Sequence, residues 1–333
     1  MTALAAVAPA RLPTRPTLAV LRAAADIVHR HMAPTAQRAW PQLSAALGAE
    51  VWVKHENQTP LGAFKVRGGL VYFERLLRRE PQLAGVIGAT RGNHGQSVAY
   101  AAGRAGLPCV IVVPHGNSRE KNAAMRALGA ELIEHGEDFQ EAREHAGALA
   151  QERRLHLVPS FHDDLVLGVA SYALELFDAT GTLDRVYVPI GLGSGICGVI
   201  AVRDALGLSS EIVGVVASGA PAYARSLAAG RCVPHAVTTV LADGMACRVP
   251  EPAAFDIIRA GASRIVEVGD DEIAAAMRLA FETTHTVVEG AGAAALAAAW
   301  REREVLAGRR IGLIFSGGNI DRALYAAVLA ETP

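Results

Sequence analysis

Several features are scarce in this 333-residue sequence: aromatic residues make up 5%, only four residues are cysteine, and the formal net charge is −1. The charge balance leaves no basic excess to neutralise a phosphate backbone, so nucleic acid is not an expected partner. The cysteines form no CxxC pair and no Cys/His group at zinc spacing, so we expect them to be reduced and buried. No uncharged apolar run approaches the ~18 residues that a membrane span requires.

The first twenty residues also lack the apolar core of an export signal, because Arg11, Arg15 and several prolines interrupt them. With neither a membrane span nor a signal, we expect a soluble, cytoplasmic protein. Hydrophobic residues make up 51% of the chain. A chain of this length and composition can bury one large α/β core or two lobes.

From about residue 50 onward, short β-branched runs alternate with longer Ala-rich segments of helical spacing. This pattern is typical of parallel strands with crossover helices, and it predicts an α/β fold. The predicted strands are residues 51–54, 85–89, 109–114, 131–135, 156–159, 185–190, 211–217, 264–268 and 310–315.

Asp138 precedes Glu141 by three positions, a capping pattern that predicts a helix over residues 139–153. The number of predicted strands exceeds one simple half-sheet, yet the chain has no repeat and no low-complexity linker. We therefore expect a second lobe formed as an excursion between Arg67 and Ser160.

Residues 57–69, NQTPLGAFKVRGG, place Lys65 among small and apolar neighbours after a predicted strand. Desolvation disfavours the ammonium form of such a lysine and leaves a nucleophilic amine suited to forming an imine with an aldehyde. Taken alone, the motif is explained better by a surface lysine at a helix start.

A glycine-rich turn, GLGSGICG, follows the predicted strand 185–190 and precedes a helical stretch at 199–206. Such a turn directs backbone N–H groups and the positive end of a helix dipole at one point, which suits a phosphate dianion. Ser194 adds a hydroxyl donor. The plain alternative is a tight turn whose glycines permit close packing.

The same turn has glycines at dinucleotide-fold spacing, so a nicotinamide enzyme is a competing interpretation. The strand that follows ends at Ala217 and Ser218, without the acidic residue that would bind the ribose of NAD. An NADP-dependent oxidoreductase stays open.

Two further polar motifs follow predicted strands. TRGNHGQ, residues 90–96, opens a helix; Asn93 offers an amide to an aromatic hydroxyl, and Thr90 with the loop amides can hold a carboxylate. SGGN, residues 316–319, lies where open α/β sheets bind ligands, and the Ser316 hydroxyl can meet a ring nitrogen. Each is also explained by an ordinary cap or turn. Their joint occurrence at strand ends indicates one site.

In this order and spacing, the motifs resemble the serine/threonine dehydratase group of fold-type II pyridoxal 5'-phosphate (PLP) enzymes over almost the whole chain. The resemblance implies a tryptophan synthase beta-like fold with two open, twisted, mostly parallel sheets in two lobes. Residues 1–66 and 161–333 would form a large PLP-binding lobe, and residues 67–160 a small mobile lobe. Because the chain ends shortly after Ser316, we expect no C-terminal regulatory domain.

The resemblance also implies residue roles. Lys65 would carry PLP as a Schiff base, Phe64 would pack on the ring, Asn93 would bond the ring hydroxyl, and Ser316 would meet the ring nitrogen. The phosphate loop maps onto Gly191, Leu192, Gly193, Ser194 and Gly195. The expected substrate contacts are Thr90, Arg91, Gly92 and His94. EGAGAA, residues 289–294, resembles a segment on the far side of the ring, and Asp243 and Gly244 resemble a supporting loop.

The implied reaction is β-elimination of water from a hydroxy amino acid such as L-threonine or L-serine, giving a 2-oxo acid and ammonia. The Lys65 amine would be the base for the Cα proton. A homodimer is also implied. β-Replacement, threonine synthase activity and a PLP-binding protein without turnover are the alternatives, and the loop RGNHGQ favours the dehydratases.

Arg91 departs from the family, which usually has Ser or Ala there, and in the related racemases that serine is the second base. An arginine is always protonated and is a poor base, so we rank racemisation below elimination. Arg91 can instead face outward, reach a second carboxylate or stack on an aromatic ring, which leaves hydroxyaspartate- and phenylserine-type substrates open. Val216 and Ala222 align with acidic cation ligands of some members, so we expect no metal.

Overall fold

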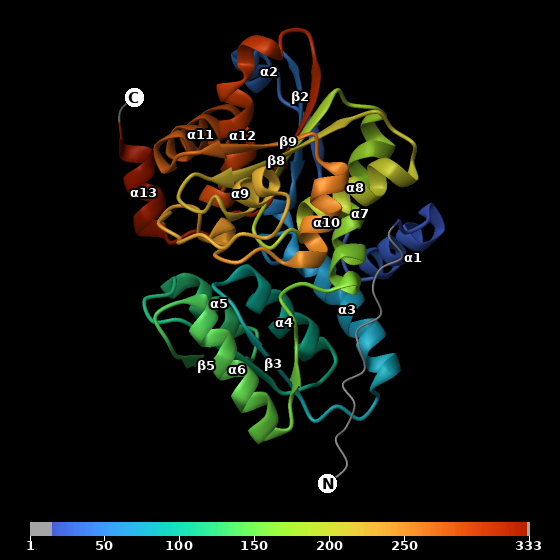
Figure 1. Cartoon of the computed structure of the whole chain (residues 1–333), viewed down its shortest axis with the longest axis vertical. Helices are drawn as coiled ribbons and strands as arrows, with labels where there is room; N and C mark the ends of the chain where they lie inside the picture. Colours follow the sequence, from blue (N-terminus) through green and yellow to red (C-terminus); the bar gives the residue numbers. More distant parts are fainter. Residues whose placement is uncertain (1–14, 332–333) are drawn as a thin grey trace.

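The computed structural model describes residues 15–331, which contain two sheets (Figure 1). The strand order is β1-β2-β10-β7-β8-β9 in the six-stranded sheet and β5-β4-β3-β6 in the four-stranded sheet. Neighbouring strands run parallel except for β1 and β2. The prediction of an α/β fold with two mostly parallel sheets is confirmed.

The six-stranded sheet comprises β1 (Gln37–Ala39), β2 (Glu50–His55), β7 (Arg185–Pro189), β8 (Glu211–Ala217), β9 (Arg264–Val268) and β10 (Arg310–Phe315). The four-stranded sheet comprises β3 (Val86–Ala89), β4 (Cys109–Val113), β5 (Glu131–Glu134) and β6 (His156–Leu157). All the predicted strands are present, with small shifts at their ends. The prediction missed β1, a short edge strand with two polar residues and no buried side chain.

The helices that accompany the six-stranded sheet are α1 (Leu18–His29), α2 (Pro41–Leu47), α3 (Lys65–Arg79), α7 (Asp163–Thr180), α8 (Ser194–Ala205), α9 (Ala222–Ala229), α10 (Pro252–Gly261), α11 (Asp270–Thr284), α12 (Gly290–Arg301) and α13 (Arg322–Ala330). Those of the four-stranded sheet are α4 (Asn93–Arg104), α5 (Arg119–Ala127) and α6 (Phe139–Arg153). The predicted helix 139–153 is confirmed, and Asp138 Oδ1 accepts from Glu141 N at 3.0 Å.

The helical stretch predicted at 199–206 was placed too late, because α8 already begins at Ser194. Two glycines that suggested an extended turn lie inside the helix. At Gly198, a Cβ would come within 3.1 Å of the backbone of Ala170 in α7. That glycine therefore serves a close helix crossing rather than a turn.

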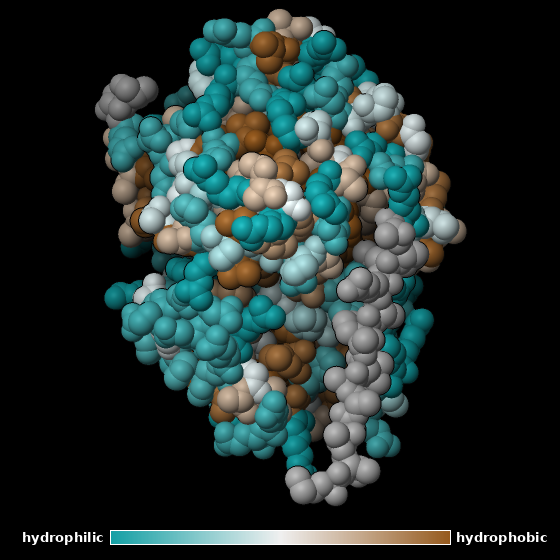
Figure 2. Space-filling model, viewed as in Figure 1, coloured by the Kyte–Doolittle hydropathy of each residue, from teal (hydrophilic) through white to brown (hydrophobic). Residues whose placement is uncertain are grey.

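We call the six-stranded sheet with its helices the large lobe, and the four-stranded sheet with α4, α5 and α6 the small lobe. In Figure 1 the large lobe lies above the small one. Separate apolar clusters fill them. The face of the small lobe formed around α5, β5 and α6 is almost wholly hydrophilic (Figure 2), so its apolar side chains point inward. In the described part of the chain, no helix combines the length and apolar character needed to cross a bilayer.

Two helices connect the lobes: α3 leaves the large lobe and α7 returns to it. Their backbones touch at glycines, since a Cβ on Gly168 would lie 2.3 Å from the Arg67 carbonyl oxygen. Asp164, in the first turn of α7, binds Arg75 and Arg79 of α3 at 2.7 and 2.9 Å. The lobe boundary predicted between residues 66 and 67 thus falls inside α3, and residues 1–14 of the predicted large lobe lie outside the described residues. The mobility of the small lobe stays a prediction.

Candidate active site

The predicted site residues lie where strands end and helices begin. Lys65 is the first residue of α3, Asn93 of α4 and Ser194 of α8, while Ser316 follows β10. Lys65 Nζ donates to Ser194 Oγ at 3.1 Å, and the amide of Phe64 donates to the Ser316 carbonyl at 3.0 Å. Segments from distant parts of the sequence therefore meet around one lysine.

The Lys65 side chain is partly buried, and its amine has no acidic partner within residues 15–331. Burial lowers the pKa of Lys65 to about 8. Its Nζ lies 4.6 Å from the centroid of the Phe64 ring. A desolvated amine next to an aromatic face and a hydroxyl is suited to nucleophilic attack on an aldehyde.

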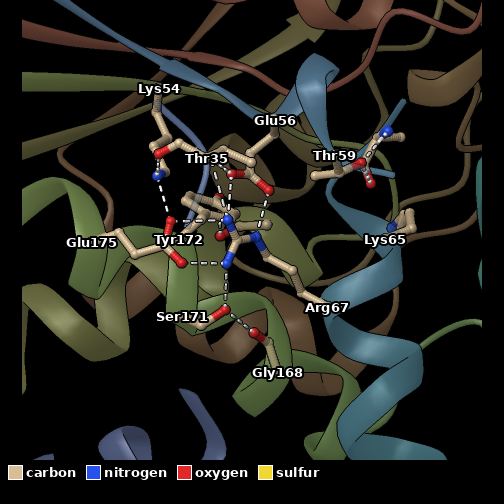
Figure 3. A network of polar contacts seen from close by, with 12 residues as sticks. Thr35, Lys54, Glu56, Thr59, Lys65, Arg67, Gly168, Ser171, Tyr172 and Glu175 are labelled. Atoms are coloured by element: carbon tan, nitrogen blue, oxygen red, sulfur yellow. Dashed lines mark hydrogen bonds and ion pairs between the residues drawn. The ribbon is translucent and has the colours of Figure 1, made fainter. Parts of the chain in front are cut away.

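A buried set of polar side chains, which we call the core network, fixes the start of α3 (Figure 3). Its members are Thr35, Lys54, Glu56, Arg67, Ser171 and Glu175. Arg67 Nε donates to Glu56 Oε2 at 2.6 Å, and Arg67 Nη1 donates to Glu175 Oε1 at 2.6 Å. In Figure 3 Lys65, two residues earlier, lies apart from this network. Arg67 therefore anchors the helix while leaving the Lys65 amine free.

Charge balance inside the core network is complete. Lys54 and Arg67 face the carboxylates of Glu56 and Glu175, and Lys54 also donates to the Thr35 carbonyl at 2.7 Å. Burial alone would raise the pKa of Glu175, but Arg67 and Lys54 lower it to about 2. Glu175 is therefore ionised at every pH at which the protein would work.

The glycine turn before α8 presents free backbone donors. The amides of Ser194, Gly195 and Ile196 have no acceptor in the described chain, and no side chain caps this end of the helix. Gly193 has φ 103°, and a Cβ there would lie 2.8 Å from the Ala254 side chain, so only glycine fits. The turn is also clamped by hydrogen bonds: Tyr223 donates to the Leu192 carbonyl at 2.8 Å. This geometry suits a phosphate.

The loop TRGNHGQ is held by its own first residue. Thr90 Oγ accepts from the backbone amides of Gly92 at 2.9 Å and Gly95 at 3.2 Å, which holds the loop and leaves the O–H proton of Thr90 without an acceptor in the described chain. The amides of Asn93 and His94 have no acceptor within residues 15–331. These two donors at the start of α4 are available to a carboxylate, and so is the unused O–H proton of Thr90.

Unpartnered polar atoms concentrate on this loop. Arg91 Nε, His94 Nε2 and Gln96 Nε2 are buried and have no hydrogen-bond partner in the described residues. Burial and the nearby Lys65 lower the pKa of His94 to about 3, so its ring is neutral. The Ser316 hydroxyl likewise makes no hydrogen bond in the described chain. Buried polar atoms are normally paired, so this cluster indicates that a polar ligand completes the site.

A second charged group, which we call the interlobe cluster, joins the two lobes. Lys121 of α5 binds Asp243 Oδ2 at 2.6 Å and Glu289 Oε2 at 3.1 Å in the large lobe. Asn93 Nδ2 donates to Glu289 Oε1 at 2.6 Å, and Asn93 Oδ1 accepts from Asn319 Nδ2 at 2.9 Å. The side chain predicted to meet a ring hydroxyl is thus already oriented by Glu289 and Asn319.

Sequence reasoning missed Lys121, although it is central to this cluster. Burial would lower its pKa, but Glu289 and Asp243 outweigh burial and raise it. The Lys121 side chain also lies where a Cβ of Gly92 would be, at 2.3 Å from Lys121 Cδ, so the site loop is built around it. The spacing of Lys121 and Met125, both buried on one face of α5, was the available signal.

The described residues contain no group of three His, Cys, Asp or Glu side chains that could hold a metal ion. Val216 lies in β8, and Ala222 is the first residue of α9. Both are apolar and buried at the positions aligned with acidic ligands. All four cysteines are free in the described chain; Cys109, Cys197 and Cys247 are buried as predicted, whereas Cys232 is only half-buried.

The chain matches the family model described as "Pyridoxal-phosphate dependent enzyme" over residues 28–317. It is 36% identical over 306 residues to the L-threonine ammonia-lyase of Geobacter sulfurreducens, covering 91% of this chain and 73% of the relative. It is 32% identical over 288 residues to the L-threo-3-hydroxyaspartate ammonia-lyase of Pseudomonas sp, covering 86% and 90%.

Solved structures give the same fold. The processed form of threonine deaminase isoform 2 from Solanum lycopersicum superposes with a TM-score of 0.86 at 29% identity, covering 99% of this chain and 100% of the other. Maize serine racemase superposes with a TM-score of 0.87 at 27% identity, covering 94% and 96%.

Proposed function

Because this chain belongs to the family of pyridoxal-phosphate dependent enzymes, we propose that it eliminates water and ammonia from a hydroxy amino acid such as L-threonine or L-serine, releasing a 2-oxo acid. Its cofactor is pyridoxal 5'-phosphate. The observation that carries the proposal is the Lys65 amine, partly buried without an acidic partner beside the free amides of α8.

The residues of the site fit the cofactor. Lys65 would bind its aldehyde, the start of α8 its phosphate, the Asn93 amide its ring hydroxyl, and the Ser316 hydroxyl its ring nitrogen. Phe64 would cover one face of the ring. When bound, the cofactor supplies an aldehyde for the amine and a ring that withdraws electrons from the substrate Cα.

Backbone amides and the Lys65 side chain of this protein would bind the substrate and move its proton. The backbone N–H groups of Asn93 and His94 donate to the α-carboxylate at the positive end of α4. The Lys65 amine accepts the proton from Cα, and a pKa of about 8 keeps a useful fraction of it neutral near pH 7.5. The His94 ring is neutral, so a contact that it makes with the substrate is a hydrogen bond and not an ion pair.

Two alternatives weaken on the same observations. The match to the PLP family argues against an NADP-dependent oxidoreductase. Racemisation needs a base on the face of the substrate opposite Lys65, and Arg91 at the matching position of the loop is a poor base. Elimination is therefore the favoured reaction although a serine racemase has the same fold.

We also propose that the protein works in the cytoplasm as a homodimer. Support for the cytoplasm comes from the free cysteines. Support for the dimer comes from the family resemblance alone. Sedimentation equilibrium of the purified full chain tests the dimer, and a single species at 34.8 kDa would contradict it.

The function is tested with the purified chain loaded with PLP. We expect a visible absorbance band that borohydride bleaches, and 2-oxo acid release from L-threonine or L-serine. Lys65→Ala should lose the adduct and on the order of 10³-fold in turnover. The chain contains only three lysines, Lys54, Lys65 and Lys121, so mass spectrometry locates the adduct without ambiguity. An adduct on either other lysine, or none, would contradict the proposal.

A further inference from the structure

Arg91 is a cation without a partner in the candidate active site. It follows Thr90 in the loop between β3 and α4, its Nε is buried, and it makes no hydrogen bond or ion pair within residues 15–331. Arg91 as a whole is half-buried, whereas Arg67 of the same region is fully buried and binds two carboxylates. A guanidinium cannot lose its proton, so burying part of it without an acceptor is unfavourable unless an anion binds there.

The acidic side chains of the site do not supply that anion. Asp243 and Glu289 both bind Lys121, at 2.6 and 3.1 Å, and the second oxygen of Glu289 accepts from Asn93. For the same reason the Lys121 ammonium is unavailable to a ligand. Apart from the titratable Lys65 amine, Arg91 is therefore the one positive charge of the described site that has no carboxylate beside it.

The groups common to all α-amino acids do not require Arg91 either. The α-carboxylate has the free amides of Asn93 and His94, and the α-amine is directed to the position of Lys65. What remains is the side chain of the substrate. A guanidinium recognises a carboxylate through two parallel hydrogen bonds, which gives both affinity and orientation.

Overall similarity does not choose the substrate, because the threonine and hydroxyaspartate ammonia-lyases match this chain at 36% and 32% identity. We infer that Arg91 determines substrate specificity and that the preferred substrate is a 3-hydroxy amino acid with a side-chain carboxylate, of the 3-hydroxyaspartate type. This inference rests on the proposed dehydratase function.

The reaction balances without an oxidant or reductant. The Cα–H and Cβ–O bonds break, a Cα=Cβ bond forms, and water leaves with the proton and the hydroxyl. The released unsaturated amine gains a proton at Cβ and loses one from its nitrogen to become an imine, and one water molecule hydrolyses the imine to a four-carbon 2-oxo diacid and ammonia. The carboxylate beside Arg91 is unchanged throughout.

The kinetic test compares kcat/KM of the holoenzyme for L-serine, L-threonine, L-phenylserine and both diastereomers of L-3-hydroxyaspartate. We expect one hydroxyaspartate diastereomer to be preferred over threonine and serine by tenfold or more. Arg91→Gln should lower the ratio of kcat/KM for hydroxyaspartate over serine by about 30-fold, the value of a charged hydrogen-bonded pair. Arg91→Lys should fall between the two. Arg104→Gln, at the other end of α4, is the matched control and should keep the wild-type ratio.

A binding test does not depend on turnover. Succinate and butyrate have four carbons each but differ in one carboxylate, and we expect only succinate to raise the Tm of the wild-type holoenzyme at millimolar concentration. Arg91→Gln should abolish that shift. Equal shifts with both acids would contradict the inference.

The outcomes separate the two proposals. If serine or threonine yields a 2-oxo acid but hydroxyaspartate is no better, the dehydratase stands and the specificity inference is wrong. If phenylserine is the best substrate, Arg91 recognises a ring and the inference is also wrong. If no hydroxy amino acid yields a 2-oxo acid, the proposed function itself fails.

Discussion

The core network and the interlobe cluster are both groups of buried charges near Lys65, but they join different parts of the molecule. Every member of the core network belongs to the large lobe or to α3, and Arg67, Lys54 and Glu56 are fully buried. The interlobe cluster takes Lys121 and Asn93 from the small lobe, and Asp243, Glu289 and Asn319 from the large one. The first is independent of how the lobes sit, whereas the second exists only while they touch.

The difference separates two uses of buried charge. A buried ion network is often no more stabilising than apolar packing of the same volume, so its role here is to fix positions. The core network fixes α3, whose first residue is Lys65. The interlobe cluster fixes Asn93 and the site loop, and it links that orientation to contact between the lobes.

Arg67→Met is the strongest way to break the core network. It leaves Glu56 and Glu175 as buried carboxylates that have lost their shared partner, so we expect the free energy of unfolding to fall by about 3–5 kcal/mol. Urea unfolding followed by circular dichroism measures this. Arg78→Met, on an exposed face of the same helix, is the control and should cost under about 0.5 kcal/mol. A similar loss of unfolding free energy for both variants would show that the core network does not stabilise the fold more than an exposed ion pair does.

The pH dependence of stability tests the same network. The pKa of Glu175 in the folded protein, about 2, lies below the ordinary glutamate value of 4.5. Its ionised form therefore stabilises the fold above about pH 4.5, and that contribution is lost as the pH falls toward 2. We expect the wild type to lose about 2 kcal/mol from this group between pH 5 and pH 3. Glu175→Gln should lack this pH-dependent loss when its free energy of unfolding is measured over the same pH range. If the unfolding free energies of the two proteins fall in parallel with pH, Glu175 is not the source of the loss.

Lys121→Met should have the smallest effect on stability and a clear effect on function. We expect about 1–2 kcal/mol of lost unfolding free energy, because Glu289 stays buried without its cation but keeps the Asn93 donor, while Asp243 is partly exposed to water. We expect kcat/KM to fall about tenfold because Asn93 loses its fixed orientation. Arg126→Met, on the next turns of α5, is the control. A stability loss as large as that of Arg67→Met would show that the two groups do not differ.

The sequence predicted the elements and the motifs because both are local. Alternating short apolar runs and capping residues located the strands, and glycine and polar residues after them located Lys65, Asn93, Ser194 and Ser316. Lys121 was missed because its partners lie far away in the chain: Asp243 follows it by 122 positions and Glu289 by 168 positions. That Thr90 binds a carboxylate stays a prediction; composition did not reveal that its oxygen also accepts two amides of its own loop.

The paired helices α3 and α7 have a consequence for how this architecture can vary. Gly168 brings their backbones together, and Asp164 ties the start of α7 to Arg75 and Arg79 near the end of α3 (Figure 1). The segment between residues 80 and 162 thus departs and returns at neighbouring points, like an insertion in a host domain. We expect that this segment can be replaced by the equivalent segment of a relative, because it contributes no strand to the six-stranded sheet.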